Sequence, residues 1–279
     1  NNDKSLNMNA RIIILSFGLL FTVPASHACI NTYAFDLGRE GLDEQSAQAE
    51  LKNLDKKFKT HQELNDYGVL LIYARQYNDA IEVFKGIEKS HPLLAKTAAN
   101  LGTVYELNGD LEKAKYWINQ GIKRDPHIHE NSEWIHLKIL DAQLEQRKNP
   151  NWIKSNDVLG LDFGYKAAPK AKVKTLEFNN QMLSLENILE HSKIQMDQRL
   201  RFVKHDPISA QIIFNMANIE AVLLSGNEDD VWSLYELADS RGFVDKALIE
   251  QRIHYIRDSK WYAFKRFFAE IINIFHNIG

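Results

Sequence analysis

Histidine and glutamate side chains, which can bind metal ions or transfer protons, gather near the middle of the chain. They are His127, His129, Glu130, Glu133 and His136. Residues with the spacing of His129 and His136 can share one face of a helix that includes both. A metal site also needs inward-facing ligands that further partners hold in place, and the sequence shows neither. These residue types are also frequent in turns and helix caps, so we expect no metal ion here.

Few other residues suggest chemistry. The single cysteine, Cys29, excludes an intrachain disulfide, a cysteine zinc site and a Cys-x-x-Cys redox pair. The sequence contains none of the motifs typical of phosphate-binding loops, dinucleotide-binding loops, serine hydrolases or zinc proteases. An enzyme would need an unfamiliar site in the second half, near His191, His205 and Asp206. We predict a protein that is not an enzyme and has no cofactor.

The composition restricts which fold classes and which kinds of partner are plausible. The chain has 34 basic and 37 acidic residues, and a net charge of −3 argues against a general nucleic-acid binder. Gly and Pro number only 13 and 6 in 279 residues, which favours helices over many short strands. We therefore expect an all-α fold whose partner is not a nucleic acid.

A repeated pattern organises the first half of the chain. Three pairs of residues recur with an offset of 34 (102 − 68, for example): Gly68 and Gly102, Ala80 and Ala114, and Pro92 and Pro126. A fixed period of this length indicates stacked helical units. We predict two antiparallel helix-turn-helix repeats, at residues 61–94 and 95–128.

The pattern resembles the tetratricopeptide repeat, in which W-x2-L-G-x2-Y is followed by A-x3-F and then by P. Leu64 and Ala98 replace the tryptophan of the two copies. Small residues allow the helices to approach, larger ones fill the remaining space, and proline ends the second helix. The positions that carry the signature are Gly68, Ala80, Phe84, Pro92, Gly102, Tyr105, Ala114, Ile118 and Pro126.

The resemblance implies a concave groove, lined by the first helix of each repeat, that holds an extended peptide or a partner helix. Carried onto this sequence, the lining positions are Gln62, Asn65, Val69, Ile72, Tyr73, Lys96, Ala99, Thr103, Glu106 and Leu107. Asn100 matches an asparagine of the family's carboxylate clamp. Asn65 and Val69 replace a lysine and an asparagine of that clamp, so we do not expect carboxylate binding.

The segments before and after the two repeats are also predicted to be mainly helical. A helix before the repeats and a third one capped by Asn131 or Ser132 complete a domain at residues 43–148. Residues 149–174 are interpreted as a linker, partly docked through apolar side chains. A second helical domain, a degenerate version of the repeat, is expected at 175–258, with a helix over residues 176–203 and another that begins at Asp206 and Pro207.

The two ends of the chain carry their own signals. Residues 1–28, with a natural start at Met8, are predicted to be a signal peptide, because Arg11 precedes an apolar run and a small-x-small site. Residues 29–42 would form an N-terminal arm, and Cys29 would carry lipid if the protein were a lipoprotein. Residues 259–279 are predicted to be an amphipathic helix that caps the second half or, alternatively, inserts into a membrane surface.

These features predict an exported scaffold of the bacterial periplasm or cell envelope that binds another protein or a peptide in its groove. One alternative is a structural protein that Cys29 or the C-terminal helix docks to a membrane. Another is an enzyme with an unrecognised site in the second half. Partner identity and oligomeric state are left open by the sequence.

Overall fold

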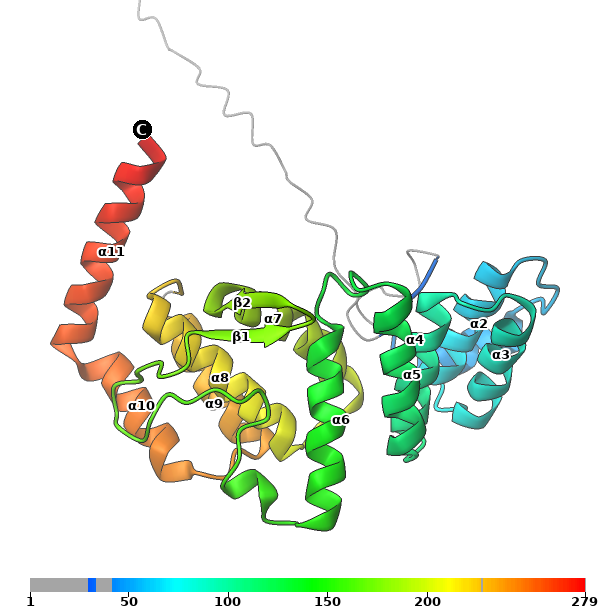
Figure 1. Cartoon of the computed structure of the whole chain (residues 1–279), viewed down its shortest axis with the longest axis horizontal. Coiled ribbons are helices and arrows are strands. Elements are labelled where there is room, and N and C mark those ends of the chain that lie inside the picture. Colours follow the sequence, from blue (N-terminus) through cyan, green and yellow to red (C-terminus); the bar gives the residue numbers. More distant parts are fainter. Residues whose placement is uncertain (1–29, 34–41, 227, 279) are drawn as a thin grey trace, which may run out of the picture.

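The computed structural model describes residues 30–33, 42–226 and 228–278, and this part of the chain is mostly helical (Figure 1). The predicted signal peptide and Cys29 lie outside the described residues. The repeats form one end of the molecule and the second half forms the other, with helix α6 between them (Figure 1). The prediction of a predominantly helical fold is confirmed.

Six helices lie in the described part of the first half, and two helical pairs lie at the positions that the repeat pattern predicts. The bounds are α1 Glu44–Asn53, α2 His61–Tyr73, α3 Tyr77–Ser90, α4 Ala95–Leu107, α5 Leu111–Arg124 and α6 Glu133–Lys148. Helix α2 begins with a capping box in which the Thr60 side chain accepts from Glu63 N and the Glu63 side chain accepts from Thr60 N. Each pair therefore has the two-helix form that its sequence indicates.

The turns inside the two pairs have the same backbone hydrogen bonds at an offset of 34. Gln76 N donates to Leu71 O, and Asp110 N donates to Tyr105 O, both at 2.9 Å. The preceding residues, Arg75 and Gly109, have φ of 59° and 87°. Arg75 is the less favourable of these two, because a side chain is strained in the left-handed region.

The glycines of the pattern lie where the paired helices are in closest contact. A Cβ atom added to Gly68 would lie 2.7 Å from Phe84 Cζ, and one added to Gly102 would lie 2.5 Å from Ile118 Cγ1. Both distances are shorter than any ordinary contact. Glycine is therefore needed at these positions, because the larger side chain of the opposite helix occupies the space.

The second half consists mainly of helices that pack around the apolar helix α8. A 3-10 helix at Trp152–Lys154 precedes β1 Thr175–Phe178, β2 Gln181–Ser184, α7 Leu185–Phe202, α8 Pro207–Leu223, α9 Glu228–Arg241, α10 Lys246–Asp258 and α11 Lys260–Ile278. Nearly all of α8 is buried. A helix that is apolar on all sides is typical of a core element surrounded by others.

The prediction of a helix from residue 176 is wrong for its first nine residues. Strands β1 and β2 pair antiparallel, with Thr175 opposite Ser184, and α7 begins only after Ser184. Asn179 and Asn180 form the turn, with φ of 49° and 62°. Asparagine tolerates this conformation well, and two such residues favour a tight hairpin. The Ser184 side chain then caps α7 by accepting from Asn187 N.

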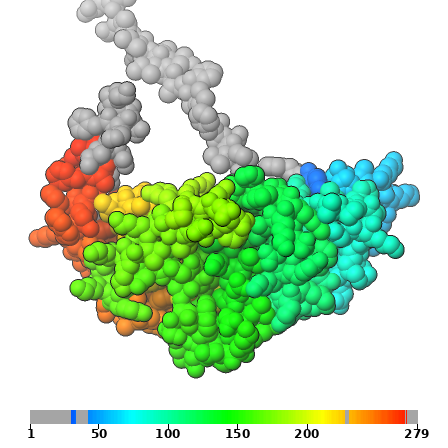
Figure 2. Space-filling view, in the orientation of Figure 1, coloured from blue at the N-terminus to red at the C-terminus, as the bar shows by residue number. Residues whose placement is uncertain are grey.

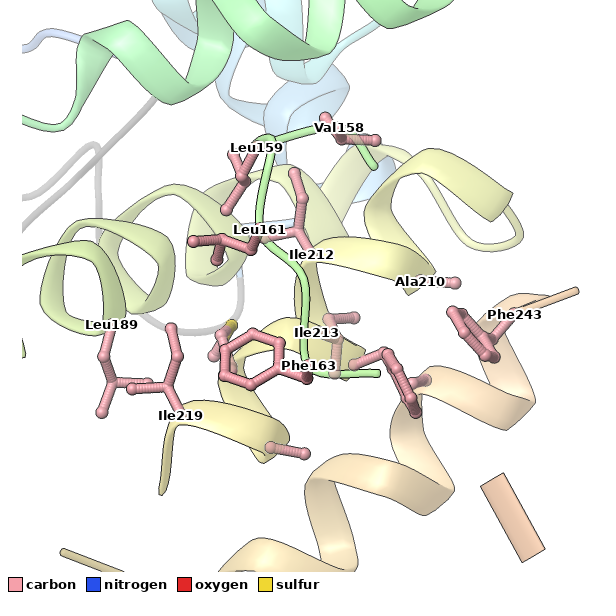
Figure 3. Packing of buried hydrophobic residues seen from close by; sticks show 14 of the residues in the cluster. Val158, Leu159, Leu161, Phe163, Leu189, Ala210, Ile212, Ile213, Ile219 and Phe243 are labelled. Atoms are coloured by element: carbon pink, nitrogen blue, oxygen red, sulfur yellow. The ribbon is translucent and has the colours of Figure 1, made fainter. Parts of the chain in front are cut away.

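The predicted linker at residues 149–174 is part of the second core. Val158, Leu159, Leu161 and Phe163 are buried among side chains of α7 and α8 (Figure 3). The fully buried Arg252 donates to the carbonyl oxygens of Phe163 and Gly164, at 3.2 and 2.7 Å. The segment lacks regular structure over most of its length, but these contacts make it a fixed component rather than a spacer.

Helix α11 extends away from the second half (Figure 1). Phe264, Phe267 and Phe268 on its apolar face are 52%, 58% and 47% exposed. The preferred expectation, that this face closes the second half, is therefore wrong at these three residues. Within the described part of the chain, no helix has the length and apolar character that crossing a membrane requires.

Candidate binding groove

Two asparagines from the first helices of the repeats bind the backbone of one residue near the N-terminus. Asn65 Nδ2 and Asn100 Nδ2 donate to Asn31 O, at 2.7 and 2.9 Å. Asn31 N donates to Asn100 Oδ1 at 2.8 Å, and Asn100 Nδ2 also donates to Asn65 Oδ1. Both asparagines are fully buried. The repeats therefore satisfy both backbone groups of Asn31 with side chains.

The neighbouring residues extend this contact along the groove. Tyr33 N donates to Asp66 Oδ1 at 2.8 Å, and Lys96 Nζ donates to Thr32 O at 2.9 Å. Lys96 Nζ also lies 4.3 Å from the centroid of the Tyr33 ring, a cation–π distance. Residues 30–33, which we call the N-terminal segment, lie against the repeats (Figure 2, blue). Their main chain is bound mostly by side chains of α2 and α4.

The side chains of the N-terminal segment differ in burial and in hydrogen bonding. Ile30 is 1% exposed and belongs to the same hydrophobic cluster as Val69 and Ile72. The Asn31 side chain is buried, yet its Nδ2 has no hydrogen-bond partner among the described residues. Partial burial, followed by the charge of Asp66, raises the pKa of Tyr33. The first helices of the two pairs thus bind the backbone of this segment, Ile30 is buried beside them, and Asn31 Nδ2 makes no hydrogen bond to the described residues.

The C-terminal end of α7 lies against residues near the ends of α2 and α4. The rings of Tyr73 and Phe202 lie 5.2 Å apart. Thr103, Leu107 and Phe202 also line a cavity of about 20 Å³ between α4 and α7. A partner could reach these residues only if α7 moved, because α7 belongs to the second half.

A buried ionic cluster joins the two halves at this end. Arg199 Nη1 donates to Glu106 Oε1 at 2.7 Å, and His136 Nε2 lies 2.7 Å from Glu106 Oε2. Burial alone would raise the pKa of Glu106, but Arg199 and His136 outweigh it and hold that pKa far below its usual range. Arg199 also contacts Asp206 and Ser209. In this cluster, Arg199 and His136 are therefore both paired with a carboxylate.

His136 connects this cluster to the start of α6. Its Nδ1 lies 3.2 Å from Glu133 Oε1, and Glu133 also binds His129 Nδ1. Burial lowers the pKa of His136, but its two carboxylate partners outweigh burial and raise that pKa to about 9. Burial raises the pKa of Glu133, and the two histidines outweigh it and lower that pKa to about 2. His136 is therefore positively charged near neutral pH.

The residues just before α6 have an unusual backbone. His129, Glu130 and Asn131 have φ of 51°, 52° and 67°, so three successive non-glycine residues adopt the left-handed backbone conformation. This conformation costs roughly 1–2 kcal/mol per residue outside glycine. Ser132 follows, and its hydroxyl accepts from Gln195 Nε2 of α7 at 3.0 Å. The strained turn thus places Ser132 in contact with α7.

The predicted lining residues fall into groups with different surroundings. Asn65 and Lys96 bind the N-terminal segment, and Gln62 is half-buried nearby on α2. Val69 and Ile72 are fully buried in the cluster that includes Ile30. Ala99 lies against Gly121 of α5, and the remaining four face α7 or the cavity beside it: Tyr73, Thr103, Glu106 and Leu107.

Three important residues were not among the predicted lining positions. Asp66 follows Asn65 in α2. Asn100 is the equivalent of Asp66 in the second repeat, and the sequence identified it only as a match to the carboxylate clamp. Both are polar residues within helices that otherwise have many apolar residues. This feature of the sequence could have identified them as binding residues. Arg199 lies 93 residues from Glu106 in the sequence, so no local pattern could link the two.

The histidines proposed as candidates for chemistry have structural contacts. His191 Nδ1 accepts from Trp134 Nε1 at 3.0 Å, and burial lowers the pKa of His191. His205 packs against Gly242, and Asp206 caps α8. In the described ranges, no three or more His, Cys, Asp or Glu side chains are arranged to hold a metal ion.

A separate cavity of about 270 Å³ lies between the 153–165 segment, α8 and the start of α10. Asp157 lines it, and burial raises the pKa of this carboxyl group. Its oxygens accept from Leu159 N, Leu161 N and Asn215 Nδ2. These bonds fix the loop onto α8, which gives Asp157 a structural role.

Comparisons with models of known protein families, with curated proteins and with solved structures find no match to this chain.

Proposed function

We propose that this chain is a non-catalytic scaffold of the tetratricopeptide type, which binds an extended segment of another protein in the groove formed by α2 and α4. The observation that carries the proposal is the pair Asn65 and Asn100, which together bind both backbone groups of Asn31. Proteins that recognise extended peptides commonly bind the peptide main chain through hydrogen bonds. Pockets for the peptide's side chains then determine which sequences bind.

The polar groups of the groove support the same proposal. Asn65, Asn100 and Asp66 are at most 9% exposed, although each has polar atoms that need partners. Buried polar groups without hydrogen bonds cost about 1–3 kcal/mol each. Groups of this kind favour an occupant that supplies a regular series of N–H and C=O groups, which is what an extended peptide supplies.

The predicted signal peptide supports a location in the periplasm or cell envelope, where the partner would be another exported protein. The test is site-specific photo-crosslinking in intact cells. A photoreactive residue at His61, whose ring lies 6.0 Å from that of Tyr33, should crosslink one partner. The same residue at the exposed Glu112 on α5 should not, and Asn100→Leu should abolish the His61 product. Equal crosslinking from both positions would contradict the proposal.

A second candidate function is attachment to a membrane surface through α11. The supporting observation is the exposed aromatic group of Trp261, Phe264, Phe267 and Phe268, of which Trp261 is 62% exposed. The rings of Trp261 and Phe264 stack at 5.6 Å, and Lys260 and Lys265 lie on the same helix. Aromatic residues next to basic ones are typical of helices that lie in the interface of anionic membranes.

Co-sedimentation with vesicles of anionic phospholipid tests this second candidate. The chain should sediment with the vesicles, and Phe264→Ser combined with Phe268→Ser should leave it in the supernatant. Tyr165→Ser is the matched control, because Tyr165 is 82% exposed but lies far along the chain from α11. Membrane attachment is excluded if the unaltered chain remains in the supernatant at low salt.

A further inference from the structure

We propose that residues 30–33 are a built-in ligand that competes with the partner for the groove. The partner then carries a segment of the same chemistry: an apolar residue, two residues read through their backbone, and an aromatic residue. This inference rests on the proposed function, since it specifies what the groove binds and how access is controlled.

The backbone N–H groups of the segment bond to equivalent positions of the two helix pairs. Asn31 N and Tyr33 N donate to Asn100 Oδ1 and Asp66 Oδ1. In an extended chain, N–H groups two residues apart point in the same direction. The two acceptors occupy equivalent positions of neighbouring helix pairs (100 − 66 = 34), so each pair binds one N–H group of the segment.

The side-chain environments define what the groove selects. Ile30 is 1% exposed within an apolar cluster, so a charged residue there would lose hydration without a partner. The Tyr33 ring is 38% exposed, and its centroid lies 4.3 Å from Lys96 Nζ and 6.0 Å from the centroid of the His61 ring. Asn31 and Thr32 are bound through backbone atoms. The selected motif is therefore apolar-x-x-aromatic.

The covalent connection explains the competition. Residues 34–41 join the N-terminal segment to Leu42, which is buried against the same repeats. A ligand tethered by a short linker has an effective local concentration on the order of millimolar. A separate peptide binds only the fraction of molecules whose groove is open, so its apparent affinity falls in proportion. Release of the segment would then be the step that permits partner binding.

The test uses the full chain and a fluorescent peptide, acetyl-Ile-Asn-Thr-Tyr-Ala-Phe-amide, followed by fluorescence anisotropy. The first variant combines Ile30→Asp with Tyr33→Ser, which weakens the segment at both side chains. A second variant, Asn31→Pro, removes the N–H that bonds to Asn100 and leaves the side chains of Ile30 and Tyr33 in place. Circular dichroism confirms that each variant is folded. Both should bind the peptide at least about tenfold more tightly than the unaltered chain.

Altered peptides test the motif. Replacement of Ile or Tyr by Asp should abolish binding to the released variants, and replacement of Thr by Ser should not. If the folded variants bind an unrelated extended peptide equally well, the motif is wrong although the groove still binds peptides. If they bind no peptide, both the inference and the proposed function fail. A dimer of the unaltered chain that becomes monomeric in Asn31→Pro would show that a second copy supplies the segment, which would overturn competition within one chain.

Discussion

Asp66 and Asn100 occupy equivalent positions in the two repeats, and their side-chain oxygens accept the N–H groups of Tyr33 and Asn31, both at 2.8 Å. The same internal period that stacks the helices thus also sets the spacing of the hydrogen-bond acceptors. The two helix pairs therefore bind the N-terminal segment through equivalent positions. This relationship is the basis for treating α2 and α4 as a peptide-binding unit.

The repeat packing makes a prediction at Gly102. Gly102→Ala should lower the free energy of unfolding by about 1–3 kcal/mol, because the new Cβ would overlap the Ile118 side chain. Gly86→Ala is the matched control, since a Cβ there meets no described atom within 4 Å in helix α3. It should raise the free energy of unfolding by about 0.5–1 kcal/mol. Urea denaturation measures both. Equal effects would show that the helix pairs are packed differently.

The ionic contact between the halves makes a second prediction. Glu106→Gln should lower the free energy of unfolding by about 3–5 kcal/mol, because it removes one of the carboxylates that pair with the buried Arg199. Asp141→Asn breaks the exposed pair with Lys115 and should cost less than about 1 kcal/mol. The double variant Glu106→Leu with Arg199→Leu should cost less than the sum of its single changes. Additive single effects would mean that the two residues do not interact.

The pH dependence of stability follows from Glu133 and His136. The pKa of Glu133 is about 2 in the fold, below its usual 4.5, so its contribution is present above pH 4.5 and is lost as the pH falls toward 2. The pKa of His136 is about 9, above its usual 6.5, so its contribution is present below pH 6.5 and is lost as the pH rises through 9. Together these two groups stabilise the protein most between pH 4.5 and 6.5.

Chemical denaturation across this range checks the prediction. The free energy of unfolding should decrease between pH 6.5 and 9 in the unaltered chain. His136→Gln should remove much of that decrease, because glutamine does not titrate. A variant with the same alkaline slope as the unaltered chain would show that His136 is not the group responsible.

Local sequence patterns predicted the helix pairs because each depends on contacts within 34 residues. The period located Gly68, Gly102 and the helix-ending prolines, and helices α2 to α5 follow from them. The hairpin at 175–184 was also encoded locally, by the Asn179-Asn180 turn and the alternation of Leu176 and Phe178 on one side. A helical interpretation of the apolar residues concealed that alternation.

Contacts between distant parts of the chain could not be predicted in the same way. Residues 149–174 have the composition of a linker, and their burial depends on a matching surface on α8. The N-terminal segment is similar: nothing in the local sequence indicates that Asn31 would meet Asn100, which is 69 residues away. Such contacts depend on the assembled shape of the groove.

Asn31 provides a test of backbone recognition. Its side-chain Nδ2 is buried without a partner among the described residues, so Asn31→Ala removes an unsatisfied polar group and keeps both backbone bonds. The change should be neutral or should raise the free energy of unfolding by about 1 kcal/mol. A loss of stability comparable to that of Asn100→Leu would indicate that the Asn31 amide, and not the backbone, is recognised.

Hydrogen exchange at the amides of Asn31 and Tyr33 tests the central claim most directly, because both N–H groups are bound by the groove. Mass spectrometry of a peptide covering residues 30–33 should show slow exchange in the unaltered chain. Asn100→Leu should make exchange fast in this peptide while α5 and α8 remain protected. Fast exchange in the unaltered chain would contradict the account, because it would mean that the groove does not hold an extended backbone.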